Sequence, residues 1–74
     1  MTWTRVGSNQ TVTVLPTGTV VFFSYATPVA AFIPGRGYLR TATLYSRTTT
    51  KHINRWVDNC VEVVPQDVID DLLA

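Results

Sequence analysis

Short alternating or continuously apolar segments fill most of the first two thirds of the chain, which is typical of β-strands. Five segments are predicted to be strands: residues 2–6, 11–15, 19–25, 29–33 and 37–46. Turn-forming residues separate them at 7–10, 16–18 and 34–37. The segment 19–25 is the most apolar and is rich in β-branched and aromatic residues, so it is predicted to be a central strand that is covered on both faces.

A proline interrupts this pattern just before the fourth segment. Pro28 has no backbone N–H to donate to a strand ladder, so an edge position, a bulge or a kink is expected there. The run Pro34-Gly35-Arg36-Gly37 predicts a hairpin turn, and the strand that follows it should return alongside residues 29–33.

The period of the pattern changes after Ser46. Ile53, Trp56, Val57 and Cys60 are spaced as one stripe of an amphipathic helix, which predicts a helix over residues 49–59 with Trp56 packed against the sheet. Thr48, Thr49 and Thr50 could each cap its first turn, and the sequence does not choose among them. After a short extended piece at 61–64, Pro65 begins a second helix over 66–73.

These elements predict an α+β fold in a single domain, residues 1–74: an antiparallel β-meander of about four to five strands followed by two short helices. Hydrophobic residues make up 46% of the chain and charged residues 15%, whereas charged residues make up about 25% of an average globular protein. Because so short a chain can bury little of that apolar surface, we expect a homo-oligomer. No apolar run is long enough to span a membrane and the N-terminus lacks a signal-peptide core, so a soluble cytoplasmic protein is expected.

The net charge of +1 conceals an uneven distribution. Five of the six basic residues lie from Arg36 to Arg55, a range without any acidic residue. All five acidic residues come after this range, namely Asp58, Glu62, Asp67, Asp70 and Asp71. A basic middle favours anionic partners such as phosphate. Alternatively, the acidic tail neutralises the basic middle, within one chain or across a dimer.

The stretch from Tyr45 to Trp56 holds most of the candidate binding chemistry. The predicted ligand-binding residues are Tyr45, Arg47, Thr48, Thr49, Thr50, Lys51, His52 and Arg55. A helix N-terminus offers free N–H donors to an anion, Arg grips phosphate or carboxylate through two parallel hydrogen bonds, and Lys adds a point charge. Either Tyr45 or Tyr38 could stack on a base. The competing interpretation is that the hydroxyls only cap the helix and the cations only keep its surface solvated.

Catalytic and metal-binding signals are absent from the sequence. Cys60 and His52 are the only residues of their kinds, so no disulfide within the chain and no metal-ligand spacing exists. Ser46 precedes His52 by six residues, but no acidic residue is marked as a partner that would orient the histidine. Neither an enzyme nor a cofactor is therefore expected.

The runs 24–30 (SYATPVA) and 45–56 (YSRTTTKHINRW), followed by Val64-Pro65-Gln66, resemble small uncharacterised proteins of bacteriophages and related mobile elements. The resemblance spans about residues 24–66, and Ser46 to Trp56 is its specific part. It implies a phage origin and a compact domain, without a mechanism.

Three functions follow as hypotheses. In the first, the Tyr45 to Arg55 surface binds a phosphate-bearing ligand such as a host nucleotide signal. In the second, this surface or a sheet edge binds and inhibits a host protein. In the third, the basic residues bind DNA or RNA, although a net charge of +1 provides little long-range attraction.

Overall fold

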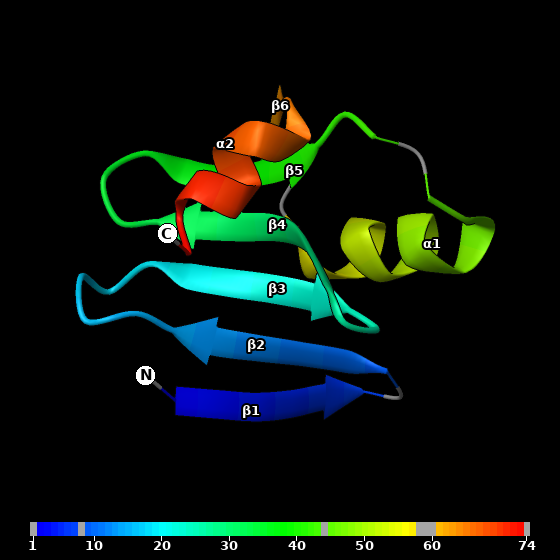
Figure 1. Cartoon of the computed structure of the whole chain (residues 1–74), viewed down its shortest axis with the longest axis horizontal. Helices are drawn as coiled ribbons and strands as arrows, with labels where there is room; N and C mark the ends of the chain where they lie inside the picture. Colours follow the sequence, from blue (N-terminus) through cyan, green and yellow to red (C-terminus); the bar gives the residue numbers. More distant parts are fainter. Residues whose placement is uncertain (1, 8, 44, 58–60, 74) are drawn as a thin grey trace.

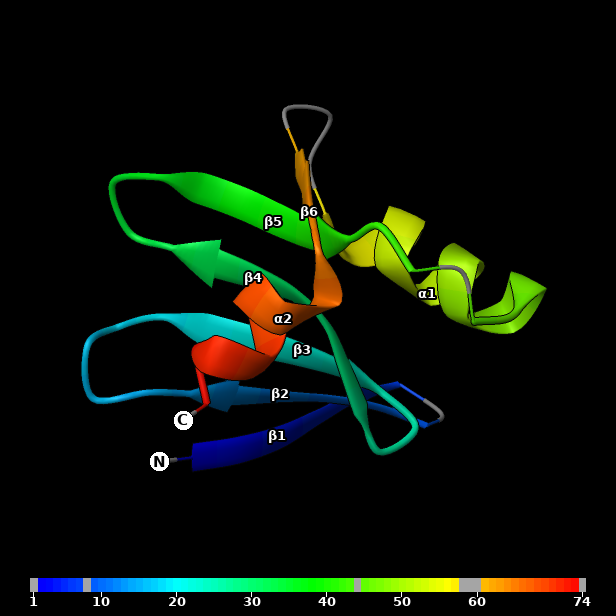
Figure 2. The ribbon, with the colours of Figure 1, turned by 45° about the horizontal axis from the view of Figure 1, so that its top comes forward.

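A six-stranded sheet with a helix on each face forms the domain in the computed structural model, which describes residues 2–7, 9–43, 45–57 and 61–73 (Figures 1 and 2). The strands are β1 (Thr2–Gly7), β2 (Gln10–Val14), β3 (Val20–Ser24), β4 (Thr27–Ile33), β5 (Gly37–Thr41) and β6 (Glu62–Val64). The helices are α1 (Arg47–Trp56) and α2 (Gln66–Asp71). The α+β class is therefore confirmed. No helix in the described ranges is both long and apolar enough to cross a membrane.

The strands lie in the sheet in chain order, and the predicted antiparallel meander accounts for the first five. The prediction of four to five strands followed by two helices was wrong at its end. β6 adds a sixth strand that pairs with β5 in parallel, with Leu39 opposite Glu62 and Thr41 opposite Val64. A parallel neighbour needs a crossover connection, and α1 lies within it. Three residues are too few for periodicity to show a strand.

β3 lies in the interior of the sheet, as its sequence predicts. Val21, Phe22, Phe23 and Ser24 are all buried, so both faces of the strand are covered. The expected irregularity beside Pro28 is a β-bulge: Phe22 pairs with Ala30 while Phe23 pairs with Pro28, which leaves one extra residue on β4.

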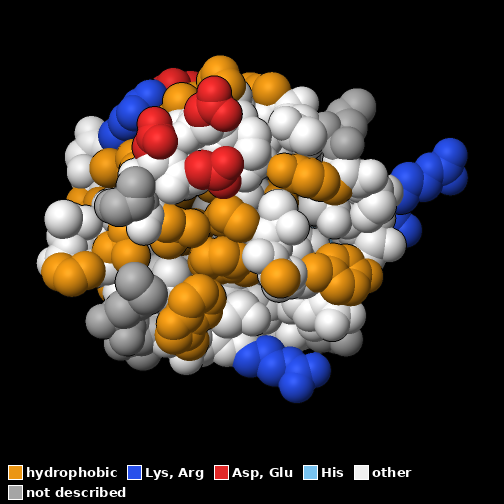
Figure 3. All heavy atoms as spheres, in the orientation of Figure 1, with side chains coloured by type: hydrophobic (Ala, Val, Ile, Leu, Met, Phe, Trp, Pro, Cys, Tyr) orange, Lys and Arg blue, Asp and Glu red, His pale blue; other side chains and the backbone are white. Residues whose placement is uncertain are grey.

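Alternating side chains divide the core between the two sheet faces. On the face covered by α1, the buried cluster consists of Phe22, Val29, Ala30 and Ile53. On the face covered by α2, the buried cluster consists of Leu39, Val64 and Ile69. We call these the α1 face and the α2 face. The exposed side of α2 carries Asp67, Asp70 and Asp71, and Figure 3 shows acidic side chains gathered over this helix.

The boundaries of α1 differ from the predicted helix 49–59. The helix begins at Arg47 and its N-cap is Ser46, whose Oγ accepts a hydrogen bond from the Thr49 N–H at 3.1 Å. None of the three threonines is therefore the cap. The helix ends at Trp56, and Cys60 lies outside the described residues.

Trp56 packs against the sheet, as predicted, although it is only half-buried. Its ring stacks on Phe22 with a centroid distance of 5.0 Å, and it meets Tyr38 edge to face at 5.5 Å. These contacts hold the C-terminal end of α1 on the sheet.

Two other predicted segments are shorter in the structure. β5 ends at Thr41 rather than at Ser46, because the Thr43 N–H donates to the Thr41 side chain in a local turn, so Tyr45 belongs to a loop. α2 ends at Asp71 rather than at residue 73.

The side chain of Thr13 is buried on the α2 face, and its hydroxyl has no hydrogen-bond partner among the described residues. Replacing Thr13 with valine keeps the shape and removes a buried polar group whose desolvation is uncompensated. We expect Thr13→Val to raise the free energy of unfolding by about 1 kcal/mol, measured by urea denaturation. The partnered Thr41→Val is the control and should be destabilising, because the Thr43 N–H would lose its acceptor. A destabilised Thr13→Val would show that the hydroxyl is in fact satisfied.

Candidate functional site

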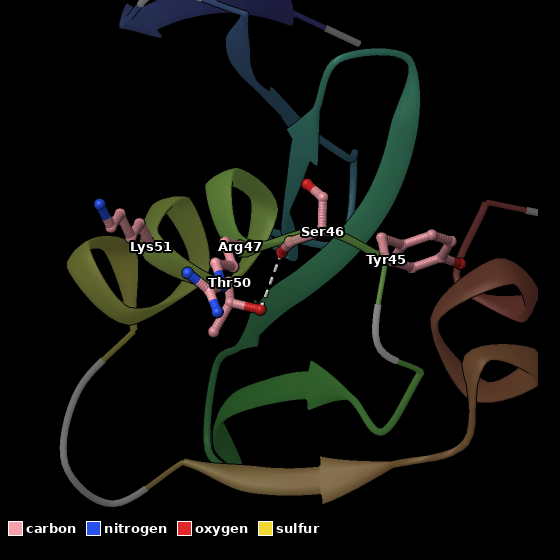
Figure 4. Close-up of a pocket in the computed structure, with 5 residues that line it drawn as sticks. All are labelled: Tyr45, Ser46, Arg47, Thr50 and Lys51. Carbon is pink, nitrogen blue, oxygen red and sulfur yellow. Dashed lines mark hydrogen bonds between the residues drawn. The ribbon is translucent and has the colours of Figure 1, made fainter.

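An open pocket of about 460 Å³ lies at the N-terminal end of α1. Its lining residues are Tyr45, Ser46, Arg47, Thr50 and Lys51, drawn in Figure 4. Tyr45 comes from the loop before α1, whereas Arg47, Thr50 and Lys51 come from the first turns of the helix. Four of the eight residues predicted from the sequence therefore lie together around one pocket, which we call the α1 pocket.

The backbone of the first turn leaves two donors at this end of the helix. Thr49 N–H donates to Ser46 Oγ, and the Thr50 N–H and hydroxyl both donate to the Ser46 carbonyl at 3.0 Å. The N–H groups of Arg47 and Thr48 have no acceptor among the described residues. These two amides can donate to water or to an anion.

The cations of α1 have no carboxylate partners within the described part of the chain. Arg47, Lys51 and Arg55 are spaced by four residues along the helix, and no acidic residue lies in its first turn. The only ion pair of the described residues joins Arg36 and Glu62 at 2.8 Å, and neither of these residues belongs to α1. The acidic tail therefore does not neutralise these three cations within the described chain, and the helix dipole adds to their positive potential.

Thr49 faces the interior, and the half-buried His52 contacts a serine of β3. Thr49 is only 5% exposed, so the prediction that its hydroxyl belongs to the binding surface was wrong. Its Oγ1 accepts from the hydroxyls of Ser46 and Ser24, both at 3.2 Å. Ser24 Oγ also lies 2.9 Å from His52 Nδ1. We call this set, Ser46, Thr49, Ser24 and His52, the hydroxyl chain.

A short contact with Ser24 holds the His52 ring. Ser24 Oγ lies 2.9 Å from His52 Nδ1, and the tautomer of the imidazole determines which of these two atoms donates the hydrogen bond. The contact fixes the orientation of the imidazole against β3.

Ser24 and His52 do not form a catalytic pair. Ser24 is 2% exposed, so its hydroxyl cannot reach a substrate carbonyl, and no carboxylate of the described chain contacts the histidine. No cluster of three or more His, Cys, Asp or Glu residues that could hold a metal ion occurs in the ranges described.

The remaining predicted residues lie apart from the α1 pocket. Thr48 is exposed and does not line it. Arg55 lines a second pocket of about 460 Å³ with Trp56, at the other end of the helix, next to the turn between β1 and β2. Of the two tyrosines considered for base stacking, Tyr38 packs against Phe32 and Trp56, whereas Tyr45 is 45% exposed.

Sequence reasoning missed two members of this region, Ser46 as the cap and Ser24 as the partner of Thr49 and His52. Ser24 lies 28 residues before His52, on a strand that was predicted only to be buried. The one available signal was a serine at the end of an otherwise apolar strand, since a buried hydroxyl needs a partner.

The chain belongs to a family of unknown function (DUF8033), whose model matches residues 1–71. Neither the curated proteins nor the solved structures contain a match to it. The description of the family names no activity and no source, so the phage origin implied by the motif stays a hypothesis.

Proposed function

We propose that this protein is a non-enzymatic binding protein that takes a phosphate-bearing small ligand, such as a nucleotide, in the α1 pocket. The observation that carries the proposal is that Arg47 and Lys51 line this pocket at a helix N-terminus, where the Arg47 N–H has no acceptor among the described residues. Neither cation has a carboxylate partner among the described residues, so an anion would relieve their mutual repulsion.

A nucleotide fits the pocket in size and in chemistry. A volume of about 460 Å³ lies within the range of small-molecule sites, roughly 300–1,000 Å³. The amides and cations suit the phosphate, and the exposed ring of Tyr45 at the rim offers a surface for a base. Thr50 and Ser46 are already bonded to one another, so they shape the wall rather than provide free donors.

The motif resemblance supports a biological setting for this activity. A phage protein that sequesters a nucleotide signal would act in the cytoplasm of the host bacterium as a host-takeover or anti-defence factor. Binding alone suffices for such a role, and no catalytic group is required.

Direct inhibition of a host protein is the second candidate, and the exposed tyrosines favour it. Tyr45 lies in the loop just before α1 and lines the α1 pocket. The centroids of the Tyr25 and His52 rings lie 6.2 Å apart. Exposed Tyr and Arg side chains are enriched at protein interfaces. In this case a carboxylate of the host protein would take the place of the phosphate. Nucleic acid is the weakest candidate because the net charge is +1.

The test is to incubate the purified protein with a host-cell extract and to identify retained small molecules and proteins by mass spectrometry. Affinity for the retained partner is then measured by calorimetry. We expect Arg47→Ala and Lys51→Ala each to weaken binding about tenfold, because each removes a charge-assisted contact worth about 1.5 kcal/mol. Their melting temperatures should stay close to that of the parent, since both side chains are exposed.

Arg36→Ala is the matched control, since it removes an exposed arginine at the hairpin between β4 and β5. It should leave affinity unchanged. Full affinity in both folded α1 variants, or retention of a ligand without an anionic group, would refute the site. A retained host protein whose binding both variants weaken would favour the second candidate.

A further inference from the structure

The geometry points to β1 as a dimer interface: we propose that two copies of this chain pair their β1 strands antiparallel, across a two-fold axis that passes midway between their Thr4 residues. The result is one continuous twelve-stranded sheet. This interface is separate from the α1 pocket, so it stands or falls independently of the proposed ligand.

β1 is the first strand of the sheet and pairs with β2 on one side only. Its outer side therefore presents a row of unpaired backbone N–H and C=O groups, which is a template for another strand. The side chains of Trp3, Thr4, Arg5 and Val6 are all exposed, and Trp3 is 57% exposed. The main helix contacts are with β3, β4 and β5, so both faces of β1 are largely uncovered.

The opposite edge of the sheet carries more features that discourage pairing than β1 does. β6 has only three residues, is followed at once by Pro65 and α2, and bears the ion pair between Glu62 and Arg36. Short length, proline and charge are the usual means by which edge strands avoid association. β1 has six residues, no proline and one charged residue, Arg5, and its register shifts only at its end, between Arg5 and Gly7.

Symmetry restricts the register of such a pair. A two-fold axis perpendicular to the sheet keeps each side chain on its own face of the sheet. Facing residues must therefore share a face, and the axis passes midway between the two copies of one residue. Trp3 and Arg5 lie on the α2 face, where the Trp3 ring packs against Phe23 at 5.0 Å, and Thr4 lies on the other face. An axis at Arg5 would set two guanidinium groups opposite each other, and an axis at Trp3 would leave Arg5 opposite no residue of β1.

An axis midway between the two Thr4 residues aligns residues 3–5, which lie in the regular part of the strand, and places each Trp3 opposite Arg5 of the second copy, twice per dimer. Cross-strand neighbours at this distance allow the cation to lie on the indole face. This self-complementarity is what favours a second copy over an unrelated strand, and the net charge of +1 leaves little repulsion between copies.

The oligomeric mass is the first measurement. Light scattering after size exclusion should give twice the chain mass of 8.2 kDa for the parent at micromolar to hundred-micromolar concentration. Thr4→Lys places two ammonium groups opposite each other at the axis and should give the mass of one chain. Thr43→Lys, at an exposed threonine in the loop after β5, should leave the dimer intact.

A cross-link tests the register without depending on the lysine variant. In a Cys60→Ala background, Thr4→Cys should oxidise to a covalent dimer, because facing Cα atoms about 4.5–5.5 Å apart lie within disulfide range. Thr43→Cys should not. A parent that stays at 8.2 kDa, an unchanged dimer mass in Thr4→Lys, or no preference of the Thr4 thiol for cross-linking would overturn the proposal.

Discussion

Replacing Phe22 with alanine is expected to lower the free energy of unfolding by about 3–5 kcal/mol. Phe22 is fully buried at the centre of the α1 face and packs with Val29, Ala30 and Ile53. It also supports Trp56, whose ring stacks on it at 5.0 Å. A 74-residue domain has a total stability of roughly 4–11 kcal/mol, so the variant should lose a large part of it and release the end of α1.

Phe32→Ala is the matched control for this prediction. Phe32 lies in β4 and packs against Tyr38 at 4.9 Å, but it is only half-buried. Its truncation should cost less than that of Phe22, since less area is removed from a closed environment. Urea denaturation followed by tryptophan fluorescence measures both. Equal losses in the two variants would contradict the placement of the main core beneath α1.

The fold was predictable from the sequence wherever a segment was long enough to show its period. The alternation in residues 11–15 and the apolar run in 19–25 predicted β2 and β3, and the stripe of Ile53, Trp56 and Val57 predicted α1. β6 was not predictable because its three residues carry no period and its partner, β5, lies across a helix. Parallel pairing across a crossover is a tertiary choice that no local pattern records.

The candidate site was predictable to the level of a helix end but not of individual side chains. Four hydroxyl residues in this stretch, Ser46 and Thr48 to Thr50, could each cap a helix. The choice depends on where the chain leaves helical geometry, and Ser46 has an extended backbone with φ of −151°. Once Ser46 is the cap, Thr49 lies one turn further on and faces the sheet, which removes it from the ligand surface.

The hydroxyl chain connects this cap to the core, and Thr49 is its central acceptor. Replacing Thr49 with valine keeps nearly the same volume but removes the oxygen that accepts from Ser24 and Ser46. Because Ser24 is buried, its hydroxyl cannot turn to water instead, and it keeps only the contact with His52 Nδ1. We expect Thr49→Val to lower the free energy of unfolding by about 1 kcal/mol, the net worth of a lost hydrogen bond.

Thr48→Val is the matched control because Thr48 is the exposed neighbour in the same helical turn, and it should change stability by less than about 0.5 kcal/mol. The combined variant Ser24→Ala and Thr49→Val removes both members of the buried pair, so its cost should be smaller than the sum of the two single costs. The free energies of unfolding of the parent, the two single variants and the combined variant form a double-mutant cycle that isolates this contact. A coupling energy near zero, or a stabilised Thr49→Val, would mean that the hydroxyl chain does not hold α1 against β3.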